Sequence, residues 1–110
     1  MANIMDYTKT ARFGPGQVVR HKRFGYHGII FDVDACYSQS PEWYEMMARS
    51  RPSKDRPWYH VLVDGETHST YVAEENLDLC NTEEKVNHPL VSQLFTEVKN
   101  GGHAIRQVLN

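Results

Sequence analysis

Short hydrophobic segments, rich in β-branched and aromatic residues and separated by glycine, proline and charged residues, recur between residues 17 and 79. Segments of this kind, bounded by turn residues, predict β-strands. Within His27–Asp34, alternation predicts that Ile29, Phe31 and Val33 share one face of the strand. Five strands are predicted in all: Gln17–His21, His27–Asp34, Trp58–Val63, Thr67–Ala73 and Leu77–Leu79.

Turn residues and helix signals define the connections between these strands. Asp64-Gly65 predicts a hairpin turn between the third and fourth strands, and Gly25 suits a positive φ in the first turn. Residues 35–57 interrupt the strand pattern, and Ser40-Pro41 predicts the start of a short helix that continues to Ala48. A single helical turn is expected just before the last strand.

Hydrophobic residues near the end of the chain recur at helical spacing instead. Asn87 can cap a helix, Pro89 fits its first turn, and Gly101-Gly102 would end it. We therefore expect a C-terminal helix with a hydrophobic face that covers the sheet. That face consists of Leu90, Val91, Leu94, Phe95 and Val98.

These elements predict a mainly β fold: a small SH3-like β-barrel of about five strands, with an inserted loop and short helix and a C-terminal helix. Closure into a barrel would protect the edges of so short a sheet. The length of 110 residues suits one domain. We expect an N-terminal tail over residues 1–12, the barrel over 13–80, and the helix and tail over 81–110.

Composition narrows the protein class. The chain has 40% hydrophobic and 24% charged residues, without a low-complexity tract, as in a soluble globular protein. It lacks a secretion signal and any long hydrophobic run, so a cytoplasmic location without a membrane partner is expected. Cys36 and Cys80 are interpreted as two free thiols, with a single disulfide left open.

The sequence does not favour catalysis, a cofactor or a metal. Six histidines are present, but none lies in a Cys-x-x-Cys, His-x-x-x-His or calcium-loop pattern. Neither cysteine lies in a setting that would lower its pKa, and no phosphate-binding glycine motif occurs. Asp32 and Asp34 could resemble a two-carboxylate site, yet acids on the outer face of a strand usually face solvent.

Charge is distributed unevenly, which makes binding the favoured function. From Lys9 to Arg56 there are nine Lys or Arg against five acids, whereas Asp64 to Glu97 has eight acids and one lysine. Cations interleaved with aromatic residues suit phosphate contact and stacking, although the same turn could simply be solvated. The candidate nucleic-acid-binding residues are Arg12, Arg20, Lys22, Arg23, Phe24, Tyr26, Arg51 and Arg56.

Five segments occur in order along the chain: FGPGQVVRH from Phe13, GYHGII from Gly25, PEWY from Pro41, PWYHVLV from Pro57 and TYVAEENL from Thr70. Together these segments resemble the YccV-like hemimethylated DNA-binding family, whose bacterial members include the heat-shock protein HspQ. Ala35 departs from a proline that the family often has there, which affects a loop exit.

The resemblance implies an SH3-like barrel, no enzymatic activity, binding of hemimethylated DNA, and in bacteria assistance to the ATP-dependent protease Lon.

Three hypotheses of function follow. For DNA, three or four phosphate contacts would give a slope of log affinity against log salt concentration of about −3 to −4, and Phe24 or Tyr26 would sense the methyl group. For Lon, the tail His103–Asn110 could be presented to the protease. Self-association through the C-terminal helix is a third hypothesis.

Overall fold

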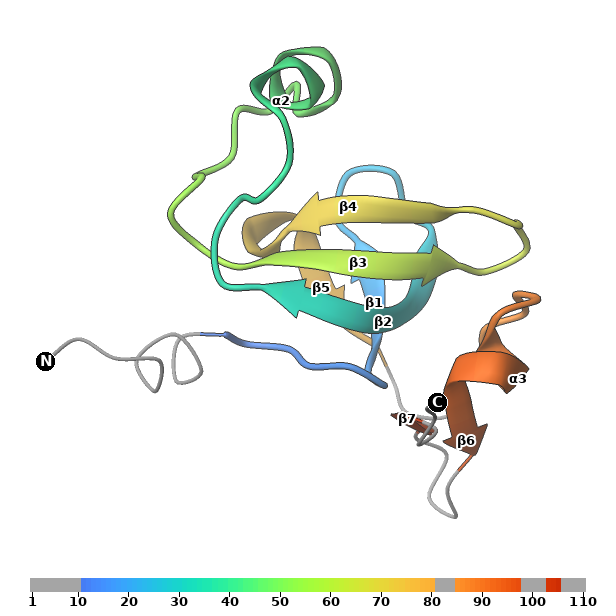
Figure 1. Cartoon of the computed structure of the whole chain (residues 1–110). Coiled ribbons are helices and arrows are strands. Elements are labelled where there is room, and N and C mark those ends of the chain that lie inside the picture. Colours follow the sequence, from blue (N-terminus) through green and yellow to red (C-terminus); the bar gives the residue numbers. More distant parts are fainter. Residues whose placement is uncertain (1–10, 81–84, 98–102, 106–110) are drawn as a thin grey trace, which may run out of the picture.

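A computed structural model describes residues 11–80, 85–97 and 103–105. The described chain is mainly β and is built around one five-stranded antiparallel sheet in the order β4-β3-β2-β1-β5 (Figure 1). Each predicted strand is confirmed, with starts that differ by at most two residues. The strands are β1 (Val18–His21), β2 (His27–Asp34), β3 (Trp58–Val63), β4 (Ser69–Ala73) and β5 (Leu77–Leu79).

The two edges of this sheet are β4 and β5. They follow each other in the chain and are joined by the 3₁₀ helix η1 (Glu74–Asn76), which confirms the predicted helical turn. Within the described residues β4 and β5 do not pair with each other, so the sheet is not closed. The predicted SH3-like barrel is thus unconfirmed, while the mainly β class and the five strands are confirmed.

The insertion between β2 and β3 contains the predicted helix, α2 (Pro41–Met47). The side chain of Ser40 accepts a hydrogen bond from the backbone N–H of Trp43, and Pro41 occupies the first turn. In the view of Figure 1, α2 lies above β4 and stands clear of the sheet. It is attached through Tyr44 and Ala48, which pack in one cluster with Trp58.

The predicted C-terminal helix is wrong in extent. Helix α3 covers only Val91–Leu94, and the chain then becomes extended in β6 (Phe95–Glu97), which pairs antiparallel with β7 (His103–Ile105). Phe95 is 2% exposed and packs with core residues of the sheet, which favours the extended chain over a longer helix. Val98 and Gly101-Gly102 lie outside the described residues.

A β-bulge in β2 changes the predicted alternation of its faces. The register with β3 shifts between Ile30 and Asp32, so Phe31 is the extra residue. Ile29 and Phe31 belong to one hydrophobic cluster, whereas Ile30 and Val33 belong to another. The prediction that Val33 shares a face with Ile29 is therefore wrong, and both isoleucines are fully buried.

The cysteines and the helices of the described residues bear on two further expectations. Cys36 and Cys80 both lie in the described residues, and no disulfide joins them. In the same part of the chain, no helix has the length and hydrophobicity needed to cross a membrane.

Candidate nucleic-acid interface

The turn between β1 and β2 is organised by a buried histidine. His21 is 6% exposed, and its Nδ1 accepts hydrogen bonds from the backbone N–H groups of Arg23 (3.1 Å) and Phe24 (3.2 Å). The backbone N–H of Gly25 donates to the His21 carbonyl at 2.8 Å, and Gly25 has φ +80°. These bonds fix the backbone of the whole turn, and a residue with a side chain would be strained at Gly25.

The imidazole of His21 must be neutral to play this role. An Nδ1 that accepts two N–H groups cannot itself be protonated, which leaves the ring proton on Nε2. Burial, and secondarily the positive charge of Arg23, lowers the pKa of His21. Both effects favour the form of the ring that supports the turn.

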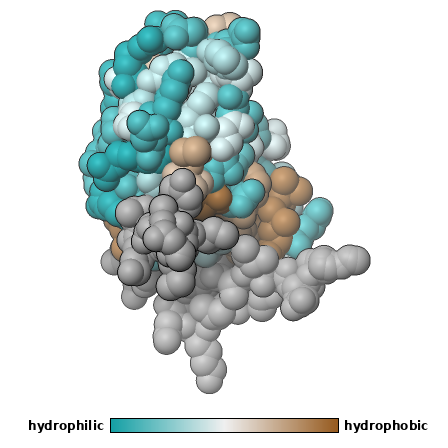
Figure 2. Space-filling model, turned by 60° about the vertical axis from the view of Figure 1, so that its left-hand side comes forward, coloured by the Kyte–Doolittle hydropathy of each residue, from teal (hydrophilic) through white to brown (hydrophobic). Residues whose placement is uncertain are grey.

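The side chain of Phe24 projects from this turn into solvent. It is 76% exposed, and its ring stacks on His21 with the ring centroids 4.6 Å apart. In the view of Figure 2, hydrophilic residues cover much of the described surface and hydrophobic residues form only small patches. Phe24 has the largest exposed fraction of the large exposed hydrophobic residues described, which are Phe24, Met46, Met47, Leu79 and Leu90.

Three cations lie near Phe24 in the sequence, Arg20 near the end of β1 and Lys22 and Arg23 on the turn itself. Arg20 donates to the carbonyl of Gly25 at 3.2 Å, and neither Arg20 nor Arg23 forms an ion pair with a described carboxylate. Lys22 lies 3.8 Å from Asp78, but both side chains are exposed, so this pair is weak. Tyr26 is turned inward, and its hydroxyl forms a hydrogen bond with Thr70 Oγ1 at 2.8 Å. Burial raises the pKa of Tyr26.

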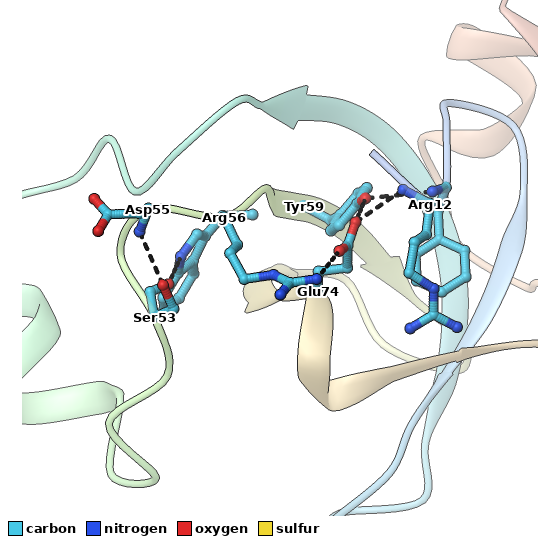
Figure 3. Close-up of polar contacts among 8 residues, drawn as sticks. Arg12, Ser53, Asp55, Arg56, Tyr59 and Glu74 are labelled. Atoms are coloured by element: carbon cyan, nitrogen blue, oxygen red, sulfur yellow. Dashed lines mark hydrogen bonds and ion pairs between the residues drawn. The ribbon is translucent and has the colours of Figure 1, made fainter. Parts of the chain in front are cut away.

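Two other predicted residues, Arg12 and Arg56, lie together at a buried carboxylate (Figure 3). Glu74 is 1% exposed and accepts from the hydroxyl of Tyr59 at 2.6 Å and from the backbone N–H of Arg12 at 2.8 Å. Arg56 Nη2 lies 3.4 Å from the other oxygen of Glu74. The guanidinium of Arg12 covers the ring of Phe13, 5.0 Å from its centroid. Arg56 therefore contacts the carboxylate of Glu74, although most of its own side chain stays exposed.

Arg51 is held within the α2 insertion. Its guanidinium forms two bonds to the carboxylate of Glu45, at 2.9 and 3.3 Å, and lies over the ring of Tyr44. The pKa of Glu45 is lowered by this hydrogen-bonded contact. The structure thus brings Arg20, Lys22, Arg23, Phe24 and Tyr26 together, and places Arg12, Arg51 and Arg56 in other contacts.

Comparison of the sequence with known protein families identifies the family of this chain. The model of the family described as "Hemimethylated DNA-binding protein YccV like" matches residues 11–102. The chain belongs to the YccV-like family. The match includes the whole five-stranded sheet, the α2 insertion, and α3 with β6, so the family of hemimethylated DNA-binding domains accounts for nearly all of the described chain.

Other aromatic residues of this YccV-like domain pack on one another. Trp58 is 1% exposed and stacks on Tyr71 with centroids 5.1 Å apart, and Trp43 meets the Tyr71 ring edge-on at 5.5 Å. Tyr37 completes the cluster, and Lys54 lies over Tyr44 at 4.3 Å. These rings attach α2 to the sheet, as expected for packing aromatics.

Two structural features of the described residues are not evident from the sequence. One is the role of His21, whose position on a strand gives no indication that its ring caps the following turn. The other is the approach of Asp32, Asp34 and His60, whose ligand atoms all lie within 4.8 Å of one another. Alternation does place both aspartates on one face, but the partner strand and the bulge are not evident from the sequence.

Proposed function

We propose that this chain binds hemimethylated duplex DNA, without catalysis, through the β1–β2 turn from Arg20 to Tyr26. The observation that supports this site is the exposed Phe24 beside Arg20 and Arg23, neither of which is ion-paired with a described carboxylate. Exposed hydrophobic surface beside cations that form no ion pair with a described carboxylate suits contact with a base edge flanked by phosphates.

Each residue of the turn has a distinct role in this proposal. Arg20 and Arg23 contact phosphates and set the orientation, and Lys22 contributes when it leaves Asp78. Phe24 enters the major groove, where a base methyl group adds hydrophobic surface, as the thymine methyl does. Because His21 already fixes the turn, little conformational entropy is lost on binding.

The test is fluorescence anisotropy with hemimethylated and unmethylated duplexes of one sequence. We expect the wild-type protein to prefer the hemimethylated duplex, and Phe24→Ala to reduce that preference to near unity while weaker binding to both duplexes persists. Met46→Ala is the matched control, since Met46 is a hydrophobic side chain of similar exposure, 71%, on α2. It should leave the preference unchanged.

Two results would contradict this proposal. Equal wild-type affinity for both duplexes would remove methyl recognition from this chain. A preference that survives Phe24→Ala but is lost in Met46→Ala would move the recognition surface from the turn to α2.

A second candidate function, assistance to Lon in a heat-shock response in the cytoplasm, is supported by the resemblance to HspQ. One observation favours a protein partner: Met46 and Met47 are adjacent on α2 and are 71% and 59% exposed. Exposed methionines are common on surfaces that bind varied protein partners. We propose that Lon or its substrate contacts this pair, and that the terminal residues after Gly102 add a point of engagement.

Degradation of a Lon substrate in vitro separates these two contributions. Met46→Ser with Met47→Ser should lower stimulation by the full chain, and truncation after Gly102 should abolish it. Unchanged degradation with both proteins would exclude this function for both surfaces.

A further inference from the structure

A row of polar side chains crosses the sheet at the end of β2 that is farther from the β1–β2 turn. Asp32 on β2 is the register partner of His60 on β3, and His60 is in turn the partner of Tyr71 on β4. Directly opposed residues project from the same face of a sheet. The bulge creates this row: without the extra residue, Phe31 rather than Asp32 would be opposite His60.

Asp34, two residues farther along β2, completes the group. Its Oδ2 lies 3.2 Å from His60 Nε2 and accepts a hydrogen bond from the Tyr71 hydroxyl at 2.7 Å. The ligand atoms of Asp32, Asp34 and His60 all lie within 4.8 Å of one another. Two ligands about 2.1 Å from one zinc ion are separated by about 3.0 Å at octahedral angles and about 3.4 Å at tetrahedral angles. The separation between His60 and Asp34 falls between these values, whereas the 4.8 Å limit for the whole set exceeds them, so the set must draw together around an ion.

The charge of the group is not balanced by nearby cations. Among the described residues, no lysine or arginine forms an ion pair with Asp32 or Asp34. Within that part of the chain, the contact of these carboxylates with a basic side chain is the one between Asp34 and His60, 3.2 Å from Oδ2 to Nε2. The side chains of Asp34 and His60 are 22% and 24% exposed, so they are partly dehydrated and still reachable.

We propose that Asp32, Asp34 and His60 bind a divalent zinc-type ion. Two carboxylate oxygens and one imidazole nitrogen form a donor set that zinc accepts, with water in the remaining position. His60 would coordinate through Nε2 in its neutral form, in place of its contact with Asp34. Tyr71 is a positioning residue, because its hydroxyl holds the Asp34 carboxylate. The ion would connect β2 to β3 beside the α2 insertion.

Asp32 can adjust to the ion without disturbing the core, while His60 is held in place. Asp32 is exposed, and its Oδ1 accepts from the adjacent N–H of Val33 at 2.9 Å, which leaves Oδ2 for the metal. The ring of His60 is supported by contacts with Phe31 and Tyr71, at centroid distances of 5.7 and 4.7 Å. A preorganised imidazole and a movable carboxylate together favour closure around an ion.

The test is a titration of the full chain with zinc chloride, followed by calorimetry and by the ¹⁵N resonances of the histidine rings. We expect one zinc ion per chain at this site and a shift of the His60 Nε2 resonance at the same equivalence point. Asp32→Asn, which keeps the side-chain size at an exposed position, should weaken zinc binding about tenfold or more. Asp55→Asn is the matched control at another exposed aspartate and should have no effect.

Three outcomes of the zinc titration would contradict the proposed site. If zinc shifts no resonance of His60, the three side chains form only a hydrogen-bonded group and the proposal fails. If Asp32→Asn and Asp55→Asn bind zinc with equal affinity, Asp32 is not a ligand and the proposed donor set is wrong. Calcium or magnesium binding as tight as that of zinc would also contradict it, since those ions favour oxygen ligands alone.

Discussion

At the scale of single residues, the buried carboxylate of Glu74 joins three parts of the chain. It accepts from Tyr59 on β3, from the backbone of Arg12 before β1, and from Arg56 in the insertion. Burial, and secondarily the hydrogen bond to the Glu74 carboxylate, raises the pKa of Tyr59 well above the usual value for a tyrosine. The glutamate is also the first residue of η1, which joins β4 to β5.

Loss of this carboxylate should destabilise the fold. We expect Glu74→Ala to lower the free energy of unfolding by about 3 kcal/mol, because Tyr59 and the Arg12 N–H would lose a buried acceptor. Arg56 should contribute little to this loss, since its side chain is 61% exposed. Urea denaturation measures the change.

The neighbouring glutamate provides the control for this prediction. Glu75 is exposed, so Glu75→Ala should change stability by no more than about 0.5 kcal/mol. Equal effects of the two substitutions would mean that net charge, and not the buried contacts of Glu74, determines the loss.

His21 should make stability depend on pH. Because its pKa in the folded state lies below the ordinary value of 6.5, the unfolded chain binds the proton more readily. Its contribution to stability is therefore fully present above pH 6.5 and is lost as the pH falls from 6.5 toward the folded pKa. An NMR titration of the His21 ring should give a pKa below 6.5. A value at or above 6.5 would contradict the neutral, hydrogen-bonded ring.

At the scale of elements, the close approach of β2 to β3 depends on Gly28. A Cβ at this position would overlap the carbonyl of Leu62 and crowd Val61, both on β3. Gly28→Ala should therefore lower stability by about 1–3 kcal/mol, through overpacking of the sheet. Thermal unfolding measures it against Gly14→Ala, where a Cβ meets nothing within 4 Å and little change is expected.

The strands were predictable because their hydrophobic residues and turn signals are local in sequence. His27–Asp34, Trp58–Val63 and Leu77–Leu79 have the predicted bounds. The bulge at Phe31 was not predictable, since it is defined by pairing with a strand more than twenty residues away. The C-terminal helix was overpredicted because Phe95 fits a helical stripe as well as a strand, and its tertiary packing decides between them.

The candidate interface was predictable in part for a similar reason. Arg20, Lys22, Arg23 and Phe24 are close in sequence and stay close in the fold, so composition alone identified this basic turn. Arg51 and Arg56 were assigned by charge alone. Their carboxylate partners, Glu45 and Glu74, are six and eighteen residues away, and only the folded chain brings them into contact.

At the scale of the whole molecule, the unequal charge distribution limits how DNA can bind. The net charge is −2, and the acidic segment from Asp64 to Glu97 would repel a phosphate backbone. Electrostatic attraction must therefore come from a small region, for which the β1–β2 turn offers three cations. Since each neutralised phosphate contributes about 0.9 to the slope of log affinity against log salt concentration, we expect a slope of about −3.

Two charge-equivalent variants test whether that slope comes from the turn. Arg23→Gln and Arg51→Gln each remove one positive charge from an exposed site, so their long-range effects on DNA are alike. Arg23 has no carboxylate partner among the described residues, whereas Arg51 is bound by Glu45. The Arg23 variant should reduce the slope by about 1 and the Arg51 variant by much less. Equal reductions would show that DNA responds to total charge, and the β1–β2 turn would lose its assigned role.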